Sequence, residues 1–195
     1  MSHLRRSRTS QQSVREAMAR VDRARYLPEE IRHRADEDAA LPIGYGQTIS
    51  QPTMVRLLCE ALELQGDEKV LDVGTGSGYQ AAVLAELARE VHSVEVIREL
   101  AEEARTRLPP GVHVHVGDGS RGLPEEAPFD SIAVAAAAAA PPAALLEQLA
   151  PGGRLVIPIG SPHHQVLHVF RDDGRVTKGV GCRFVPLVFA QHPPG

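Results

Sequence analysis

The sequence predicts a protein of the α/β class, with a doubly wound, mostly parallel sheet of about seven strands and an antiparallel C-terminal finish. Short apolar runs alternate with helical stretches over residues 69–160, which is typical of parallel strands joined by helical crossovers. A glycine-rich turn follows the first of these runs. Two later apolar runs have no helix between them, which predicts antiparallel neighbours.

The first part of the chain predicts helices and one loop. Residues 1–12 contain three arginines and no long apolar run, so we expect a flexible basic arm. Ser13 and Glu16 have the spacing of a capping box, which predicts that the first helix begins there. A short helix, a loop of small residues and a second helix are then expected at residues 29–34, 35–50 and 52–66.

The sheet is expected from residue 67 onwards. Its predicted strands are residues 69–73, 91–96, 112–117, 129–135, 154–160, 165–170 and 182–189. The predicted helices are residues 79–88, 98–108 and 142–149. We interpret the alanine run at 135–140 as compositional drift at a strand-to-helix corner. Together these elements predict one Rossmann-like domain over residues 13–195, with N-terminal helices and a substrate loop in 13–66, a cofactor-binding core in 67–160 and closing strands in 161–195.

Composition argues against several kinds of partner. The net charge is −4 and aromatic residues make up only 4% of the chain, so we expect no nucleic-acid partner. No apolar run approaches the ~20 residues that span a bilayer, so we expect no membrane association. The two cysteines, Cys59 and Cys182, do not form a disulfide framework, which favours a cytoplasmic location. We expect a monomer.

The histidines do not indicate a metal site in the sequence. His113 and His115 alternate along one predicted strand, and a His163–His164 pair lies in a loop, but no cysteine or acidic cluster adjoins them. We therefore predict that no metal is bound. His92 and His168 are expected at the edge or surface of the sheet. Cys59, on an apolar helix face, is expected to be a small buried residue.

The glycine-rich turn points to a nucleoside cofactor. Its glycines are at 74, 76 and 78, and Tyr79 stands where a dinucleotide fingerprint needs its last glycine. A phosphate-binding P-loop would need Lys followed by Ser or Thr, which the turn lacks. With Asp72 two residues before the first glycine, the turn resembles the motif of class I methyltransferases, whose cofactor is S-adenosylmethionine.

Three acids suit the parts of this cofactor. Asp72 would serve the ammonium of its methionine part through water or backbone, while N–H groups of the glycine turn bind the carboxylate. Glu95 ends the second strand and is placed to accept both ribose hydroxyls. Asp118, in the turn after the third strand, could accept from the adenine amine. Their order along the chain predicts a site for S-adenosylmethionine.

Several segments together resemble the protein-L-isoaspartate O-methyltransferase family over about residues 14–187. The specific one is LPIGYGQTISQP at residues 41–52, and others lie at residues 72–85, 117–119, 126–130, 151–158 and 183–187. The chain departs from the family pattern where Asp36 replaces an aromatic residue, Ala135 a Thr or Gly, Ala139 a Pro, and Cys182 a Val.

The resemblance implies methyl transfer from S-adenosylmethionine to the α-carboxylate of L-isoaspartyl residues in damaged proteins, which starts repair through a succinimide. It implies Ser50 as the catalytic residue, although position alone also suits a helix N-cap. The substrate would be bound by Ile43, Gly44, Gln47, Thr48 and Ile49. The cofactor would be bound by Thr48, Ser50, Asp72, Gly74, Thr75, Gly76, Ser77, Gly78, Glu95, Val96, Asp118 and Gly119.

Alternative functions remain at this point. The nearest is a carboxyl methyltransferase that acts on an ordinary aspartate of a dedicated biosynthetic peptide. Two alternatives of another kind are a nucleoside-binding oxidoreductase, which Tyr79 argues against, and a non-catalytic cofactor binder, which Ala135 and Ala139 leave open. An assay with paired isoaspartyl and aspartyl peptides separates them.

Overall fold

The computed structural model describes residues 2–187, and the side chains of residues 11–187, and is built around one seven-stranded sheet. The strand order is β5-β4-β3-β6-β7-β8-β9. Pairing is parallel from β5 to β7 and antiparallel from β7 to β9. The strands are β3 Lys69–Val73, β4 Glu90–Glu95, β5 Val112–Val116, β6 Phe129–Val134, β7 Leu149–Ser161, β8 His164–Arg171 and β9 Val176–Cys182. The predicted fold class is confirmed.

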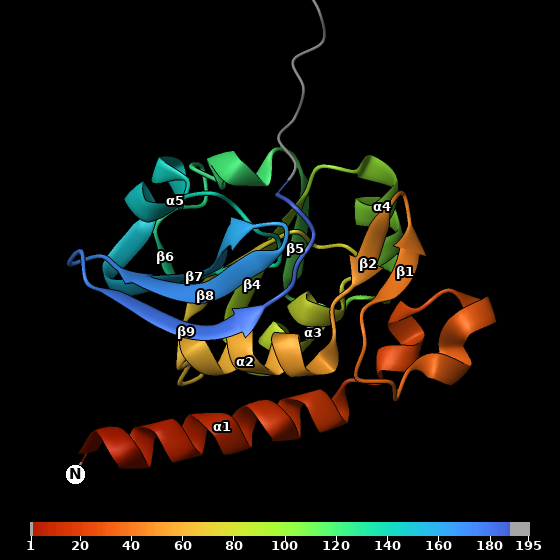
Figure 1. Cartoon of the computed structure of the whole chain (residues 1–195), viewed down its shortest axis with the longest axis horizontal. Helices are drawn as coiled ribbons and strands as arrows, with labels where there is room; N and C mark the ends of the chain where they lie inside the picture. The colour runs from red at the N-terminus through yellow and green to blue at the C-terminus, as the bar shows by residue number, and fades with distance from the viewer. Residues whose placement is uncertain (1, 188–195) are drawn as a thin grey trace, which may run out of the picture.

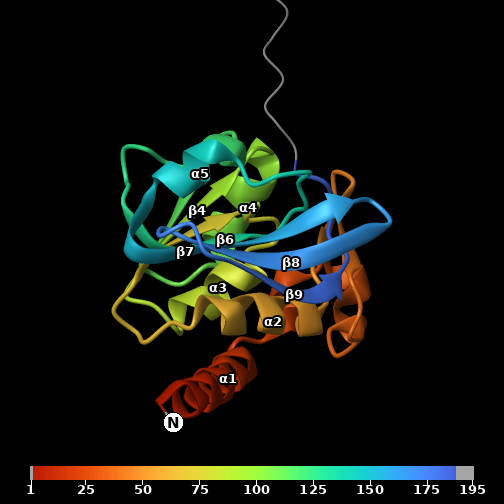
Figure 2. The same ribbon diagram turned by 60° about the vertical axis from the view of Figure 1, so that its left-hand side comes forward.

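Helices cover both faces of the sheet, as its apolar parallel strands require. On one face pack α2 (Pro52–Leu62), α3 (Tyr79–Ala85) and α4 (Arg98–Arg107), which share one core cluster with residues of β3 and β4. On the other face packs α5 (Ala143–Glu147), whose Leu145 contacts Leu71 and Phe129 in a second cluster. Figures 1 and 2 show α5 and α2 on opposite sides of the sheet.

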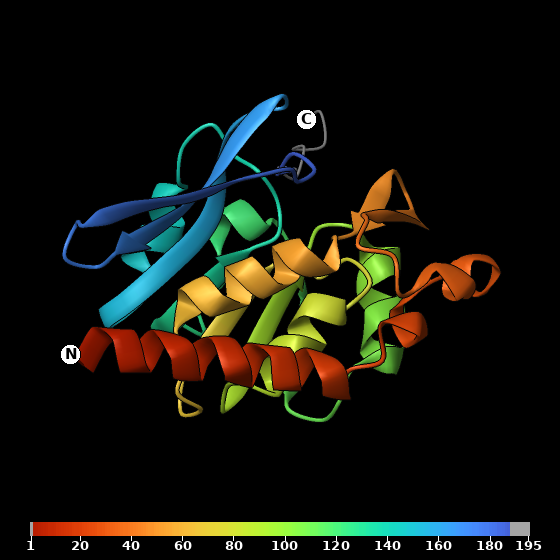
Figure 3. The same cartoon turned by 60° about the horizontal axis from the view of Figure 1, so that its bottom comes forward.

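The N-terminal helix differs from its predicted extent. Helix α1 runs Ser2–Arg20, so it does not begin at a capping box at Ser13, and the arm expected at residues 1–12 is helical from Ser2. The segment contains no Gly or Pro that would end a helix before Ser13, and arginine favours helices. Val14 and Ala17 are buried, and Figure 3 shows α1 beside α2.

The predicted loop at residues 35–50 contains a hairpin that the sequence did not indicate. After 3-10 helices η1 (Arg23–Tyr26) and η2 (Glu29–Arg34), strands β1 (Leu41–Gly44) and β2 (Gln47–Ile49) pair antiparallel. Tyr45 and Gly46 make the turn with φ of 53° and 70°. Strands of three and four residues are too short to show a recognisable alternation of apolar and polar residues. They are seen only in the structure, where Leu41 and Ile49 are buried in the core.

The C-terminal strands also differ from the prediction. The last strand is β9 at Val176–Cys182, not residues 182–189, of which 188–189 lie outside the described residues. Strand β9 is an exposed edge strand interrupted by two glycines, so its sequence lacks the continuous apolar pattern of a buried strand. The apolar segment 183–187 instead folds back over the sheet, where Phe184 and Leu187 are buried. Among the described residues, no helix is both long and apolar enough to cross a membrane.

Candidate active site

A pocket lies at the carboxyl ends of β3, β4 and β6. This edge is where ligands bind in open α/β sheets. Four segments supply most of its wall: residues 47–50 in and just after β2, 74–77 of the glycine turn, 95–97 at the end of β4, and 185–187 near the C-terminus. Ala135 and Ala136 after β6, Gln80 of α3 and Gly119 of the 3-10 helix η3 (Gly119–Arg121) add to it.

The glycine turn is shaped by positive φ angles. Gly74 and Gly76 have φ of 94° and 51°, a region that L side chains avoid. The N–H groups of Gly74 and Thr75 donate to Val94 O, at 2.9 and 3.3 Å, and Gly76 N donates to Glu95 Oε2 at 2.8 Å. These donors, which we expected to bind the cofactor's carboxylate, are thus engaged inside the protein. The turn therefore brings the backbone of 74–77 to the pocket wall chiefly through its shape.

Asp72 lies behind the pocket rather than in its wall. It is fully buried, and its two oxygens accept from Gln80 Nε2 at 2.7 Å and Ser93 Oγ at 2.8 Å. Burial raises the pKa of Asp72 to about 6, although these two hydrogen bonds lower it. Asp72 therefore acts on the pocket through Gln80, which it holds in place.

Gln80 provides a test of whether the expected cofactor fits. Its side chain lines the pocket, and its Oε1 is buried without a hydrogen-bond partner. A buried acceptor of this kind is costly unless a donor reaches it. The ammonium of the cofactor's methionine part is such a donor, so the residues present fit S-adenosylmethionine.

Glu95 has the chemistry expected for a ribose diol. It ends β4, is only 6% exposed and lines the pocket. Its Oε1 accepts from Ile97 N at 3.0 Å and its Oε2 from Gly76 N at 2.8 Å. These bonds hold the carboxylate in one orientation, and each oxygen keeps a second lone pair for a hydroxyl donor.

The turn after β5 contributes backbone to the pocket. Gly119 lines the pocket, and a Cβ at this position would lie 2.5 Å from Val73 Cγ1, so no larger residue fits without a shift. Asp118 does not line the pocket. Its Oδ1 accepts from Ser120 N at 2.9 Å and Ser120 Oγ at 2.7 Å, which caps η3.

Ser50 lines the pocket and does not cap α2. The N-cap position is Gln51, and the N–H of Thr53 donates to Asp38 Oδ1 at 2.9 Å. Asp38 Oδ2 also accepts from Thr53 Oγ1 and Gln51 Nε2, and these bonds lower the pKa of its carboxyl. No hydrogen bond within residues 11–187 engages Ser50 Oγ, so its hydroxyl is available to a ligand.

Arg23 is a supporting residue that the sequence analysis missed. Its buried guanidinium donates to four backbone oxygens: Ala35 O and Ala39 O at 2.8 Å, Glu37 O at 3.1 Å and Ser50 O at 3.2 Å. Burial lowers the pKa of Arg23, while nearby Tyr79, Asp38 and Glu37 raise it. Residue 23 thus ties the segment before the hairpin to the backbone of Ser50. No local pattern indicates this, because the four oxygens meet only after folding.

The alanine run and residues 185–187 form one rim of the pocket. Ala137 N donates to Val185 O, and Leu187 N donates to Ala137 O, both at 2.8 Å. The run thus joins β6 to α5, as predicted, and its middle residues Ala137 and Ala138 also pair with neighbouring segments. Ala135 lines the pocket near Gly74, whereas Ala139 is exposed and is not part of the wall. Asp36 is also exposed.

The structure brings most of the predicted residues together. The predicted residues in the pocket wall are Gln47, Thr48, Ile49, Ser50, Gly74, Thr75, Gly76, Ser77, Glu95, Val96 and Gly119. Those outside the wall are Ile43, Gly44, Asp72, Gly78 and Asp118. Ile43 packs beneath the turn, where its Cδ1 lies 3.5 Å from the position of a Cβ on Gly76. A Cβ on Gly78 would lie 3.2 Å from Leu108 Cγ, so Gly78 serves the packing of α4.

Comparison with known sequences gives a consistent picture. The family model described as protein-L-isoaspartate(D-aspartate) O-methyltransferase matches residues 1–192. A Myxococcus xanthus protein-L-isoaspartate O-methyltransferase is 49% identical over 185 residues, covering 89% of this chain and 87% of its own. A Marinobacter nauticus protein-L-isoaspartate O-methyltransferase 2 is 54% identical over 184 residues, which cover 90% of this chain and 84% of the relative.

Solved structures agree. A crystal structure from Plasmodium falciparum, assigned as a protein-L-isoaspartate O-methyltransferase in complex with S-adenosyl-L-homocysteine, has a TM-score of 0.80 and 25% identity and covers 90% of both chains. A second protein-L-isoaspartate O-methyltransferase structure has a TM-score of 0.78 and 27% identity, covering 89% of this chain and 60% of that one.

Proposed function

Because the chain belongs to the protein-L-isoaspartate O-methyltransferase family, we propose that the pocket described above is its methyl-transfer site and that Ser50 holds the substrate carboxylate there. The chain is a methyltransferase that uses S-adenosylmethionine and modifies L-isoaspartyl residues of damaged proteins, which initiates their repair. The observation that supports the site most directly is the unengaged hydroxyl of Ser50 on the same wall as the glycine turn and Glu95.

The reaction depends mainly on how the methyl donor and the accepting carboxylate are oriented. S-adenosylmethionine supplies the methyl group, on a sulfonium that carries a positive charge. The accepting carboxylate is already ionised at neutral pH, since its ordinary pKa is ~3.9, so no strong general base is needed. Holding both partners in line is worth up to ~7–11 kcal/mol in well-aligned cases.

The charges around the pocket suit this reaction. The reaction joins an anion to a cationic donor, so charge is lost in the transition state and a fixed cation beside the carboxylate would oppose it. Among the described residues, the pocket wall includes no Lys or Arg, and Glu95 is its only acid. A serine hydroxyl donates one hydrogen bond without adding charge, which is the property required of Ser50.

Each part of the cofactor has a proposed partner. Gln80, held by Asp72, accepts from the ammonium, and Glu95 accepts from the ribose hydroxyls. The Asp118–Gly119 turn takes the adenine end, and Ser77, Thr75 and Val96 complete the wall. On the substrate side, the hairpin backbone from Ile43 to Ile49 pairs with the extended main chain around the isoaspartyl residue. Arg23 supports this loop from behind.

The remaining proposals concern partners and location. Cys59 is buried and Cys182 half-buried, both are free thiols, and burial raises the pKa of each, as suits unreactive cysteines in the cytoplasm. The monomer expected from the sequence stays a prediction. The net charge of −4 supports proteins, rather than nucleic acids, as partners.

Paired peptides test the proposal. The purified chain is incubated with radiolabelled S-adenosylmethionine and two peptides that differ only in an isoaspartyl or aspartyl linkage. We expect base-labile label on the isoaspartyl peptide alone. In Ser50→Ala, kcat should fall by about 10–100-fold, as for one lost hydrogen bond to a charged group, with cofactor affinity nearly unchanged.

Exposed Ser161 provides the matched control, and Ser161→Ala should behave as wild type. Label on the aspartyl peptide would point to a dedicated aspartyl substrate instead. Equal turnover in Ser50→Ala and wild type would remove Ser50 from the reaction.

A further inference from the structure

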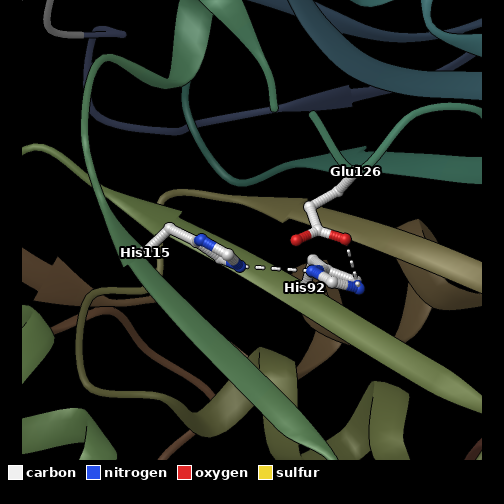
Figure 4. A group of neighbouring side chains, drawn as sticks. All are labelled: His92, His115 and Glu126. Carbon is white, nitrogen blue, oxygen red and sulfur yellow. Dashed lines mark hydrogen bonds and ion pairs between the residues drawn. The ribbon is translucent and has the colours of Figure 1, made fainter. Parts of the chain in front are cut away.

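A cluster of two histidines and three charged side chains lies on the sheet away from the pocket. His92 of β4 and His115 of β5 meet Glu126, which lies in the segment before β6 (Figure 4). One ligand atom from each of these three residues lies within 4.8 Å of the other two. His92 is only 4% exposed, so the prediction that it lies at the edge or surface is wrong. None of the three lines the methyl-transfer pocket.

Parallel pairing of β4 and β5 assembles the cluster. His92 is the register partner of His113, and His115 lies two residues further along on the same face. The His92 ring contacts the His115 ring at 5.4 Å and the Phe129 ring at 5.9 Å between centroids. This face is the one covered by α5, and the phenyl ring of residue 129 fills the space below His92.

The hydrogen bonds of His92 orient its ring for a ligand role. Nε2 lies 2.8 Å from Glu90 Oε1, so it donates to that carboxylate and Nδ1 is left as an acceptor. That Nδ1 faces His115 Nε2 at 3.2 Å. A histidine that binds metal through one nitrogen commonly donates its other N–H to a carboxylate, as His92 does to Glu90.

The spacing of the two nitrogens fits a tetrahedral cation. With metal–nitrogen bonds of ~2.0–2.1 Å, neighbouring ligands of a tetrahedral ion lie about 3.3 Å apart. The 3.2 Å between His92 Nδ1 and His115 Nε2 matches this distance.

Glu126 and its neighbours supply the charge. The Glu126 side chain is 38% exposed and its Oε2 lies 3.8 Å from His92 Nε2, so the carboxylate must rotate to reach His92 Nδ1 and His115 Nε2. Its Oε2 lies 3.5 Å from Lys69 Nζ, and the Lys69 ammonium also donates to Glu126 O at 2.6 Å. Glu90 is already engaged by His92 and by Arg89, so Glu126 is the carboxylate that can serve as a ligand.

We propose that His92, His115 and Glu126 bind one borderline divalent cation, Zn²⁺ by its ligand chemistry, with a water in the fourth position. Two imidazoles and one carboxylate form a donor set typical of this metal. The ion joins β4, β5 and the segment before β6, and its role is to stabilise the edge of the sheet. It takes no part in methyl transfer. No metal was predicted from the sequence because no cysteine or acidic cluster adjoins the histidines along the chain.

Metal titration of the untagged, chelator-treated chain tests the proposal. Co²⁺ replaces Zn²⁺ as a visible probe, and we expect the strong d–d absorption of a tetrahedral site, saturating at one ion per chain and displaced by Zn²⁺. At a hundredfold excess of Zn²⁺ over Kd, Tm should rise by about 5–10 °C.

Variants assign the site. His115→Gln and Glu126→Gln should weaken Co²⁺ binding at least tenfold. Mutation of residues that only hydrogen-bond to metal ligands already lowers metal affinity by ~10–100-fold, and a ligand should matter at least as much. A His163→Gln/His164→Gln double variant, whose exposed side chains lie outside the cluster, should bind as wild type. Circular dichroism of the metal-free proteins checks that each variant is folded.

Three results would overturn the proposal: no tetrahedral absorption in wild type, unchanged affinity in both ligand variants, or equal loss in the control variant. The cluster would then be a hydrogen-bonded histidine pair alone. Binding of S-adenosylhomocysteine, measured in parallel, should be the same in all these variants, so the outcome is independent of the methyl-transfer site.

Discussion

Replacing Asp72 by asparagine should remove the free energy that the folded protein spends on ionising a buried carboxyl group, which depends on pH. Asp72 is fully buried, and burial raises its pKa from the ordinary 3.8 to about 6. Between these two values the folded state holds a proton that the unfolded state has released. Stability therefore falls as the pH rises through this window and is constant, for this group, above pH ~6.

The size of the effect follows from the two pKa values. The gap between 3.8 and about 6 corresponds to about 3 kcal/mol, at ~1.4 kcal/mol per pH unit. Asparagine keeps the shape and can still bond to Gln80 and Ser93, but it carries no charge at any pH. Relative to wild type, Asp72→Asn should therefore gain about 3 kcal/mol of unfolding free energy between pH 4 and pH 7.5.

Urea unfolding at a series of pH values measures this difference. The quantity of interest is the free energy of unfolding of Asp72→Asn minus that of wild type, because titration of all other groups cancels. We expect it to rise between pH 4 and pH 6.5 and then level off. Exposed Asp67→Asn should give a flat difference. A flat or falling difference for Asp72→Asn would refute the argument that burial dominates this carboxyl.

Two further changes probe the site. Arg23→Lys should lower the free energy of unfolding by about 2–4 kcal/mol and raise KM for the peptide, because one ammonium cannot replace a guanidinium that serves four carbonyls. Exposed Arg25→Lys is the control in thermal unfolding and peptide kinetics, and equal behaviour of the two variants would contradict the role. Glu95→Ala should weaken cofactor binding by about 1–3 kcal/mol in calorimetry. Exposed Glu99→Ala should leave it unchanged, and an unaltered Kd in Glu95→Ala would place the ribose elsewhere.

The sequence by itself determined the sheet and the place of the pocket. Runs such as residues 69–73 are apolar on both faces because parallel strands are covered on both sides, and that pattern is readable locally. The carboxyl ends of the strands then locate the glycine turn and Glu95 at one edge. The signature loop that contains Ser50 was specific enough to name the family.

Only the tertiary structure decided how the supporting residues act. Asp72 was expected to act on the cofactor's ammonium through water or backbone, and the structure shows that its carboxylate bonds to Gln80 and Ser93 instead. Arg23 donates to carbonyls from segments far apart in sequence, and His92 contacts a histidine from another strand. No local pattern in the sequence indicates either set of contacts. Strand register and chain crossovers bring such groups together, so their chemistry exists only in the folded chain.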